Sequence, residues 1–147
     1  MLRSASQISL VAASSLGKCP SKVEVHPERL AMAGELRRAI DTGDMQLYLQ
    51  PKVEIATGQV LGVEALVRWK HTDRGLIPPA EFIEFAEHAG LIKNLTDWVI
   101  EAAMRICHEA QTRGEALPIS VNLSAKNLRD EALVGRVRIR LLFDGEA

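Results

Sequence analysis

The sequence has few aromatic residues, almost no net charge and no long apolar run. Phe, Trp and Tyr make up 4% of the 147 residues, which argues against a surface that binds nucleic acid by base stacking. Eighteen Lys and Arg residues against 19 Asp and Glu residues give a net charge of −1, so nothing attracts the whole chain to nucleic acid or anionic lipid. No stretch reaches the roughly 18–20 apolar residues of a membrane span. We therefore expect neither nucleic acid as a partner nor a membrane span.

Cysteine is also scarce, and the two cysteines form no metal-binding or disulfide pattern. Cys19 and Cys107 are far apart in the sequence, with no CxxC motif and no histidine at ligand spacing. Cys107 lies in a helical apolar pattern, which predicts a small buried side chain. This usage fits a reducing compartment, and we expect a cytoplasmic location. The apolar stretch 8–16 is interrupted by serines and imitates a signal peptide only loosely, so residues 1–27 are expected to form an N-terminal tail or linker remnant.

What the sequence does contain is enough apolar material for one globular domain. Apolar residues make up 47% and charged residues 25%, which are ordinary values for a soluble protein with a core. From Pro27 onwards the pattern alternates between helices and strands. Helices are predicted over 27–42, 79–89 and 95–110, and strands over 45–53, 60–69 and 118–124. The short turn at 56–59 predicts an antiparallel first strand pair, and the later helices predict a βαβ crossover, so the fold class is α/β.

Each of the three predicted strands carries a polar residue that is unfavourable in an apolar core unless it has a partner. Period-two alternation places Glu64, Leu66 and Arg68 on one face of the second strand. Glu64 and Arg68 lie about 13 Å apart along the strand, so each needs its own partner. A metal ion for Glu64 and a phosphate for Arg68 are possible, and so is an ordinary salt bridge for each. Asn122 on the third strand and Gln50 on the first are open to the same two interpretations, a binding role or an ordinary structural contact.

The histidines add no second site. His71 with Asp73, and Glu84 with His88, do not match a metal-binding pattern, and we expect these side chains to be solvated.

Several phrases of the sequence, in order, resemble the EAL domain, the bacterial cyclic-di-GMP phosphodiesterase family. The similarity covers about Glu28 to Leu133, which is most of the chain. The phrases are Tyr48-Leu49-Gln50-Pro51, Glu64-Ala65-Leu66-Val67-Arg68-Trp69, Gly75-Leu76-Ile77-Pro78-Pro79, Ala86-Glu87-His88-Ala89-Gly90-Leu91-Ile92 and Val121-Asn122-Leu123-Ser124. Because several independent motifs occur in order, the resemblance is far more specific than a single Glu-Ala-Leu.

The resemblance implies a fold, a reaction and roles for individual residues. The family fold is a TIM-like (β/α) barrel with an antiparallel first strand, of which this chain holds roughly the first three strands. The family uses Mg²⁺ or Mn²⁺ to hydrolyse cyclic-di-GMP to pGpG in bacterial signal transduction. By motif matching, Glu64 and Asn122 take metal-ligand positions, and Gln50, Leu66 and Arg68 take substrate-binding positions.

The resemblance also implies an incomplete catalytic set. We expect a partial EAL domain over 28–134 and a divergent C-terminal tail over 135–147, because the family's later acidic and lysine residues have no counterpart here. This predicts a phosphodiesterase domain fragment that is inactive alone. The alternatives are a non-catalytic cyclic-di-GMP-binding or protein-interaction module, and a truncated gene remnant. Expected partners are cyclic-di-GMP and the missing barrel half, a GGDEF domain or a homodimer partner.

Overall fold

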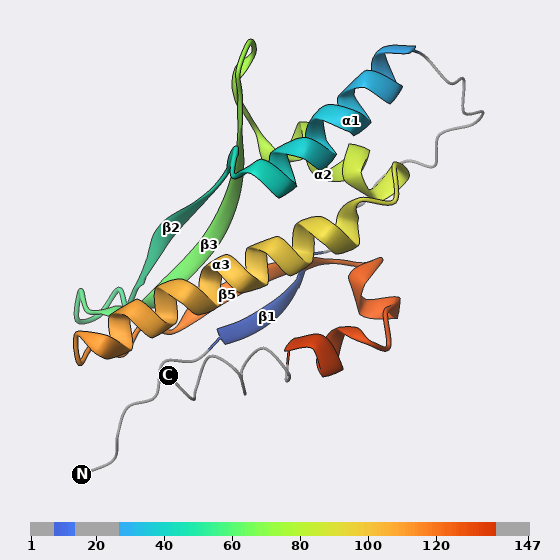
Figure 1. Ribbon diagram of the computed structural model, residues 1–147. Helices are drawn as coiled ribbons and strands as arrows, with labels where there is room; N and C mark the ends of the chain where they lie inside the picture. Colours follow the sequence, from blue (N-terminus) through green and yellow to red (C-terminus); the bar gives the residue numbers. More distant parts are fainter. Residues whose placement is uncertain (1–7, 14–26, 138–147) are drawn as a thin grey trace.

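The structure is a computed structural model that describes residues 8–13 and 27–137. Its elements form one twisted sheet with helices packed on it (Figure 1). In chain order they are β1 (Ile8–Ala13), α1 (Pro27–Thr42), β2 (Met45–Val53), β3 (Val60–His71), β4 (Gly75–Ile77), α2 (Pro79–His88), α3 (Ile92–Thr112), β5 (Ile119–Ser124) and the 3-10 helix η1 (Asn127–Arg129). A last helical turn covers 133–137.

The sheet has the order β1-β5-β3-β2, and β4 pairs with β3. Strands β2 and β3 are antiparallel, whereas β3 and β5 are parallel and are connected through α2 and α3. This arrangement confirms the predicted α/β class and the antiparallel first pair of the EAL-like segment. The turn between β2 and β3 contains Gly58 at a φ of 72°, a left-handed conformation that favours glycine.

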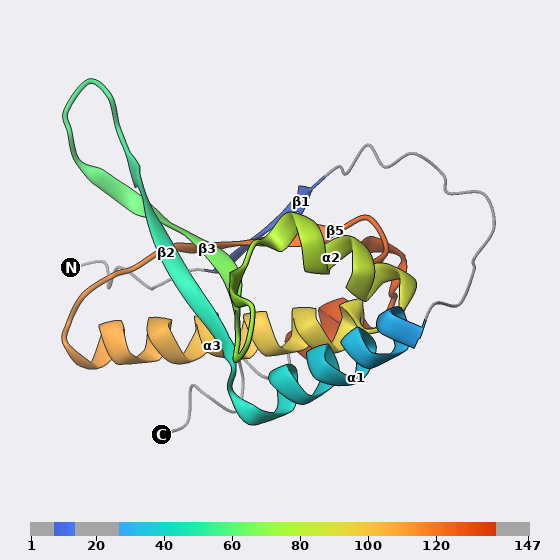
Figure 2. The same ribbon diagram turned by 90° about the horizontal axis from the view of Figure 1, so that it is seen from above.

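Helix α3 covers one face of the sheet (Figure 2). Alternation along β5 directs Ile119, Val121 and Leu123 towards this helix, and each is at most 3% exposed. They pack against a stripe of α3 residues, and burial of such side chains is worth roughly 1.5–3 kcal/mol each. The α3 stripe consists of Val99, Ile100, Ala103, Met104 and Cys107. Burial raises the pKa of the Cys107 thiol, which agrees with its expected role as a small core residue.

A second core lies where β3 ends against α1 and α2. Trp69 is 1% exposed, and its ring meets Phe82 edge-on at a centroid distance of 6.1 Å. Leu36 of α1 and Ile77 of β4 complete the cluster. Next to it, His71 Nε2 lies 3.1 Å from Glu35 Oε2, while Nδ1 accepts hydrogen bonds from the backbone N–H groups of residues 73 and 74. The expectation that His71 is solvated is therefore wrong, because its side chain is only 11% exposed.

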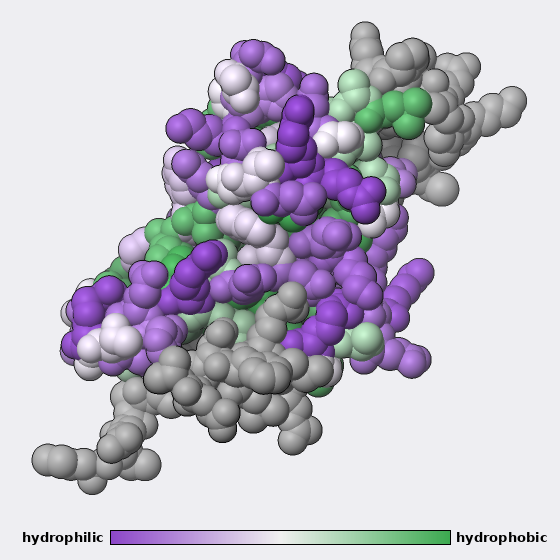
Figure 3. Space-filling view, in the orientation of Figure 1, coloured by the Kyte–Doolittle hydropathy of each residue, from purple (hydrophilic) through white to green (hydrophobic). Residues whose placement is uncertain are grey.

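The β2–β3 hairpin extends beyond the helix that covers the sheet. Its tip carries exposed apolar residues, and Figure 3 shows apolar surface over these two strands. The exposed residues are Val53, Ile55, Val60 and Leu61. In the parts of the chain that the structure describes, no helix combines the length and the apolar content that a bilayer span needs.

Several parts of the structure lie outside the helices and strands predicted from the sequence. Residues 8–13, which fall in the expected tail, form strand β1, and the short strand β4 lies between the predicted strand 60–69 and the predicted helix 79–89. After β5 the chain forms η1 and a short helical segment over 133–137. Much of the tail at 135–147, like Cys19, lies outside the described residues.

An ion-pair group attaches the last helical turn to α3. The Arg136 guanidinium lies 3.1 Å from Asp97 Oδ1 and 2.8 Å from Asp130 Oδ2. The hydrogen bond from Arg136 holds the pKa of the Asp130 carboxyl below its ordinary value, and the same contact raises the pKa of Arg136.

This pairing predicts a loss of stability in acid. Because the pKa of Asp130 is lower in the folded chain than in the unfolded one, its contribution is present above about pH 4 and is lost as pH falls through the folded-state value. We expect Asp130→Asn to show a smaller drop in unfolding free energy between pH 6 and pH 3 than wild type. Urea titrations at both pH values measure this, and equal drops in the two proteins would contradict it.

Candidate functional site

The candidate site lies on the sheet face opposite α3, near the centre of the sheet. Backbone register places Gln50 of β2 opposite Glu64 of β3, and Glu64 opposite Ser120 of β5. Side chains paired in this way point to the same face of a sheet. Gln50 and Asn122 are exposed and Glu64 is half-buried, so this row borders solvent. The structure thus brings residues from three strands together on one face of the sheet.

The closest contact in the site joins Glu64 to Asn122. The Asn122 Nδ2 group donates a hydrogen bond of 2.7 Å to Glu64 Oε1, across the β3–β5 boundary. The strands pair over only three residue pairs, which end at Ala65 and Val121, so Asn122 is the first β5 residue beyond the ladder. Glu64 therefore has a partner of its own, as its distance of about 13 Å from Arg68 along the strand requires. Glu64 Oε2 and the Asn122 side-chain carbonyl oxygen take no part in this hydrogen bond.

Arg68 lies further along the same face and has a different set of neighbours. Its guanidinium carbon is 5.7 Å from the centroid of the Tyr48 ring, and Nη1 donates to the Val67 carbonyl at 2.9 Å. The Tyr48 ring orients the arginine by a cation–π contact. Leu66 is half-buried on β3 and pairs with Tyr48 in the antiparallel register. Arg68 forms no ion pair with a carboxylate among the described residues, so its charge is available to an anion.

Lys52 belongs to this face as well, although no sequence motif marks it. Its Nζ donates to Ser120 Oγ at 2.7 Å and so crosses from β2 to β5. Gly62 is its register partner on β3, and a Cβ at Gly62 would come within 2.7 Å of the Pro118 carbonyl oxygen. Glycine is therefore required for β3 to approach the start of β5. The signal in the sequence was the same alternation, since Lys52 lies two residues after Gln50.

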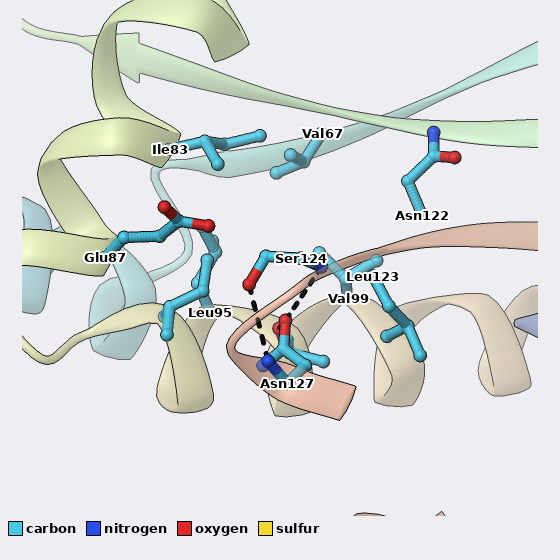
Figure 4. A pocket seen from close by; sticks show the side chains of 11 residues that line it. Val67, Ile83, Glu87, Leu95, Val99, Asn122, Leu123, Ser124 and Asn127 are labelled. Carbon is cyan, nitrogen blue, oxygen red and sulfur yellow. Dashed lines mark hydrogen bonds between the residues drawn. The ribbon is translucent and has the colours of Figure 1, made fainter. Parts of the chain in front are cut away.

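A small cavity lies beside the site, between the carboxyl ends of β3 and β5 and helices α2 and α3. Its volume is about 100 Å³, and most of its lining is apolar, including Val67, Leu95 and Val99. Binding pockets for nucleotide-sized ligands measure roughly 300–1,000 Å³, so this cavity is too small for such a ligand. Figure 4 shows Asn122 on one side of the β5 ribbon and Asn127 on the other.

Asn127 anchors the carboxyl end of β5 from within the protein. Its side chain is 3% exposed, and its Oδ1 accepts hydrogen bonds of 3.0 Å from the Thr96 hydroxyl and from the Ser124 backbone N–H. Both contacts hold the strand end next to Asn122 in place.

We expect Asn127→Ala to destabilise the chain by about 2–3 kcal/mol, because it leaves the Thr96 hydroxyl and the Ser124 N–H buried without an acceptor. Denaturant unfolding measures the change. Leu128→Ala is the control, since Leu128 is 57% exposed and its truncation costs less than about 0.5 kcal/mol. Equal losses in the two variants would contradict the anchoring role.

The oxygen donors of the site suit a hard divalent cation but are few. Glu64 supplies a carboxylate and Asn122 a neutral carbonyl oxygen, which are ligands that Mg²⁺ and Mn²⁺ accept. Such ions take about six ligands, so these two residues leave most positions to water or to a phosphate. No group of three or more His, Cys, Asp or Glu residues gathers in the described ranges 8–13 and 27–137.

Glu64, Asn122 and Arg68 thus lie on the open face of a mixed α/β sheet, opposite α3. The EAL domain family model matches residues 33–146. The chain is 43% identical over 118 residues to an uncharacterized signaling protein of Caulobacter vibrioides, and 41% identical over 112 residues to the cyclic di-GMP phosphodiesterase NbdA of Pseudomonas aeruginosa. These alignments cover 80% and 76% of this chain, respectively.

A solved structure shares the fold of this chain. The fold matches the PaMucR phosphodiesterase in its c-di-GMP complex with a TM-score of 0.74 and 38% identity, over 80% of this chain and 47% of that one. The chain belongs to the EAL domain family. It spans 14% of the length of each of the two curated relatives, so it corresponds to a small part of those proteins.

Proposed function

We propose that this chain is the amino-terminal part of an EAL domain that binds cyclic-di-GMP together with Mg²⁺ or Mn²⁺ and does not hydrolyse it unaided. The observation that carries the proposal is the Glu64–Asn122 contact on a sheet face that also presents Gln50 and Arg68. The solved PaMucR phosphodiesterase is a c-di-GMP complex, and the relative NbdA is a cyclic di-GMP phosphodiesterase. Both support a cyclic dinucleotide as the ligand.

Each site residue has a physical role in this proposal. Glu64 and Asn122 hold the cation by their oxygens, and Arg68, fixed over the Tyr48 ring, pairs with a phosphate of the ligand. Leu66 provides an apolar contact between these groups, and Gln50 offers hydrogen bonds to the ligand. When bound, the cation neutralises phosphate charge and lowers the pKa of a coordinated water.

Turnover needs more than this face provides. A general base must lie within hydrogen-bond reach of the attacking water, and Glu64 is committed to the cation in the proposed arrangement. Lys52 Nζ, another charged group of the face, is hydrogen-bonded to Ser120. We therefore expect binding without hydrolysis. The alternative of a binding module shares this behaviour, whereas a gene remnant would bind nothing.

The test is to incubate the purified full chain with cyclic-di-GMP and Mn²⁺, and to follow both binding and the formation of pGpG. Saturable, Mn²⁺-dependent binding without pGpG is the expected result. If the wild-type chain forms pGpG and Glu64→Ala does not, the proposed lack of hydrolysis is wrong. Absence of binding in a folded chain would overturn the proposal as a whole.

Arg68 provides a prediction that separates phosphate binding from metal binding. We expect Arg68→Ala to weaken cyclic-di-GMP binding at least about tenfold, because a charge-assisted hydrogen bond is worth roughly 1.5–3 kcal/mol. Mn²⁺ binding measured without the dinucleotide should stay unchanged. The control is Arg105→Ala, which removes the same charge from the exposed surface of α3. If both variants lose the same affinity, the effect is one of net charge and Arg68 has no specific role.

A further inference from the structure

Glu87 is a charged residue to which the proposed function gives no role. It is the second-last residue of α2, it is half-buried, and it lines the cavity between the carboxyl ends of β3 and β5. Figure 4 shows its carboxylate directed into this cavity, towards the space between Ile83 and Ser124. Among the residues that the structure describes, no group forms a hydrogen bond or an ion pair with this carboxylate.

An unpaired carboxylate is unfavourable at this position for two reasons. The lining of the cavity is mostly apolar, including Val67 and Leu95, so the carboxylate loses water without gaining a donor from the protein. Glu87 also lies in the last turn of α2, where the helix dipole disfavours negative charge. Residues that break such local rules without compensation within the fold are expected at functional sites. We therefore expect a bound molecule to supply the missing donors.

The end of α2 is held next to the candidate site. Lys126 Nζ, from the turn after β5, donates a hydrogen bond of 2.5 Å to the backbone carbonyl oxygen of Glu87. Asn122, a proposed cation ligand, lines the same cavity, and so does Val67, whose carbonyl oxygen accepts a hydrogen bond from Arg68. The Glu87 carboxylate thus lies at the same end of the sheet as the groups proposed to hold the cation and the phosphate.

The charges around Glu87 restrict the kind of group that can pair with it. A phosphate is unfavourable because its charge has the same sign. A cation needs more ligands than one carboxylate, and residues 8–13 and 27–137 contain no group of three or more His, Cys, Asp or Glu residues. The Lys126 ammonium on the Glu87 backbone would also repel a cation. What remains is a neutral group with N–H donors, and the two carboxylate oxygens best accept two adjacent donors.

The size of the cavity restricts this group further. Its volume is about 100 Å³, whereas a cavity of roughly 150 Å³ admits a single benzene ring and a whole nucleotide needs several hundred Å³. The edge of one base can therefore enter while the rest of the ligand stays outside. The Watson–Crick edge of guanine has two adjacent donors, N1–H and the 2-amino group, whereas that of adenine has one donor beside an acceptor.

We propose that Glu87 is a specificity residue that accepts hydrogen bonds from N1–H and the 2-amino group of one guanine of cyclic-di-GMP. The inference rests on the proposed function, because it requires a cyclic dinucleotide held at Glu64, Asn122 and Arg68. It adds the selection of the base, which contacts to a cation and a phosphate do not provide.

The test compares cyclic-di-GMP with cyclic-di-IMP, which lacks only the 2-amino group of each base, by calorimetric titration of the full chain at fixed Mn²⁺. The wild-type chain should bind cyclic-di-GMP at least about tenfold more tightly, which is the effect of one charge-assisted hydrogen bond. In Glu87→Ala the ratio of the two dissociation constants should be at least about tenfold smaller than in wild type. A merely structural effect would weaken both dinucleotides equally and leave the ratio unchanged.

Glu84→Ala is the matched control, because Glu84 is an exposed residue of α2, about one turn before Glu87. It should keep the wild-type ratio. A wild-type ratio in Glu87→Ala, or equal binding of both dinucleotides by the wild-type chain, would overturn the role of Glu87 and leave the proposed function intact. If the folded wild-type chain binds neither dinucleotide, the proposed function and this inference both fail.

Discussion

Glu64→Gln should weaken Mn²⁺-dependent binding of cyclic-di-GMP at least about tenfold while the fold is preserved. Substitution of residues that merely support metal ligands costs roughly 10–100-fold in affinity, and removal of a ligand's charge should cost no less. The glutamine keeps an oxygen that can accept the 2.7 Å hydrogen bond from Asn122, so the strands should stay in register. Calorimetric titration of cyclic-di-GMP at fixed Mn²⁺ gives the change in affinity, and circular dichroism checks the fold.

The matched control for this prediction is Glu101→Gln. Glu101 is an exposed residue of α3, on the opposite side of the sheet from the site, and its substitution changes the net charge by the same amount. Its affinity should equal that of wild type. If Glu64→Gln binds cyclic-di-GMP as tightly as Glu101→Gln does, Glu64 is no metal ligand, and its pairing with Asn122 is structural.

Trp69→Ala should have the largest effect on stability. The side chain is 1% exposed and is packed between Phe82, at a centroid distance of 6.1 Å, and His71, at 5.2 Å. Truncation of a buried tryptophan costs about 3–5 kcal/mol through lost burial and the remaining cavity. Domains of this size have a total stability of about 5–15 kcal/mol, so this variant should be mostly unfolded or close to it. Urea unfolding followed by circular dichroism measures the loss.

Leu76→Ala tests whether this effect is specific to the second core. Leu76 belongs to β4, one residue before the register partner of Trp69, but its side chain is 50% exposed. Its truncation should change the unfolding free energy by less than about 0.5 kcal/mol. A Trp69→Ala variant as stable as Leu76→Ala would contradict the packing of α1 and α2 on the end of β3.

Features of the fold that depend only on the local pattern of apolar and polar residues could be predicted from the sequence. Strand β2 has the predicted bounds, and the alternation of β3 correctly placed Glu64, Leu66 and Arg68 on one face, because side-chain period follows directly from strand geometry. The pairing partner of Glu64 did not follow from the pattern, because it depends on the register between β3 and β5. The roles of the site residues in binding stay predictions.

Two other features depend on contacts between distant parts of the chain. Strand β1 has only six residues, and among its described side chains Ser9 is polar and Ile8 is half-buried. Its pairing requires the edge of β5, which lies more than 100 residues away in the sequence, because Ile8 pairs with Ile119. Asn127 is buried because Thr96, 31 positions earlier, provides its partner. Neither contact leaves a periodic signal near the residue itself, so neither could be predicted locally.

In the proposed function, Glu64 and Asn122 jointly hold a divalent cation on the open face of the sheet. Paramagnetic line broadening by Mn²⁺ in the presence of cyclic-di-GMP tests it directly, because broadening falls steeply with distance from the ion. We predict that the Asn122 side-chain amide and the backbone signals of Glu64 broaden first, while those of Asp130 and Glu101 remain sharp. Broadening centred on Asp130 or Glu101, with Asn122 unaffected at saturating dinucleotide, would contradict the claim.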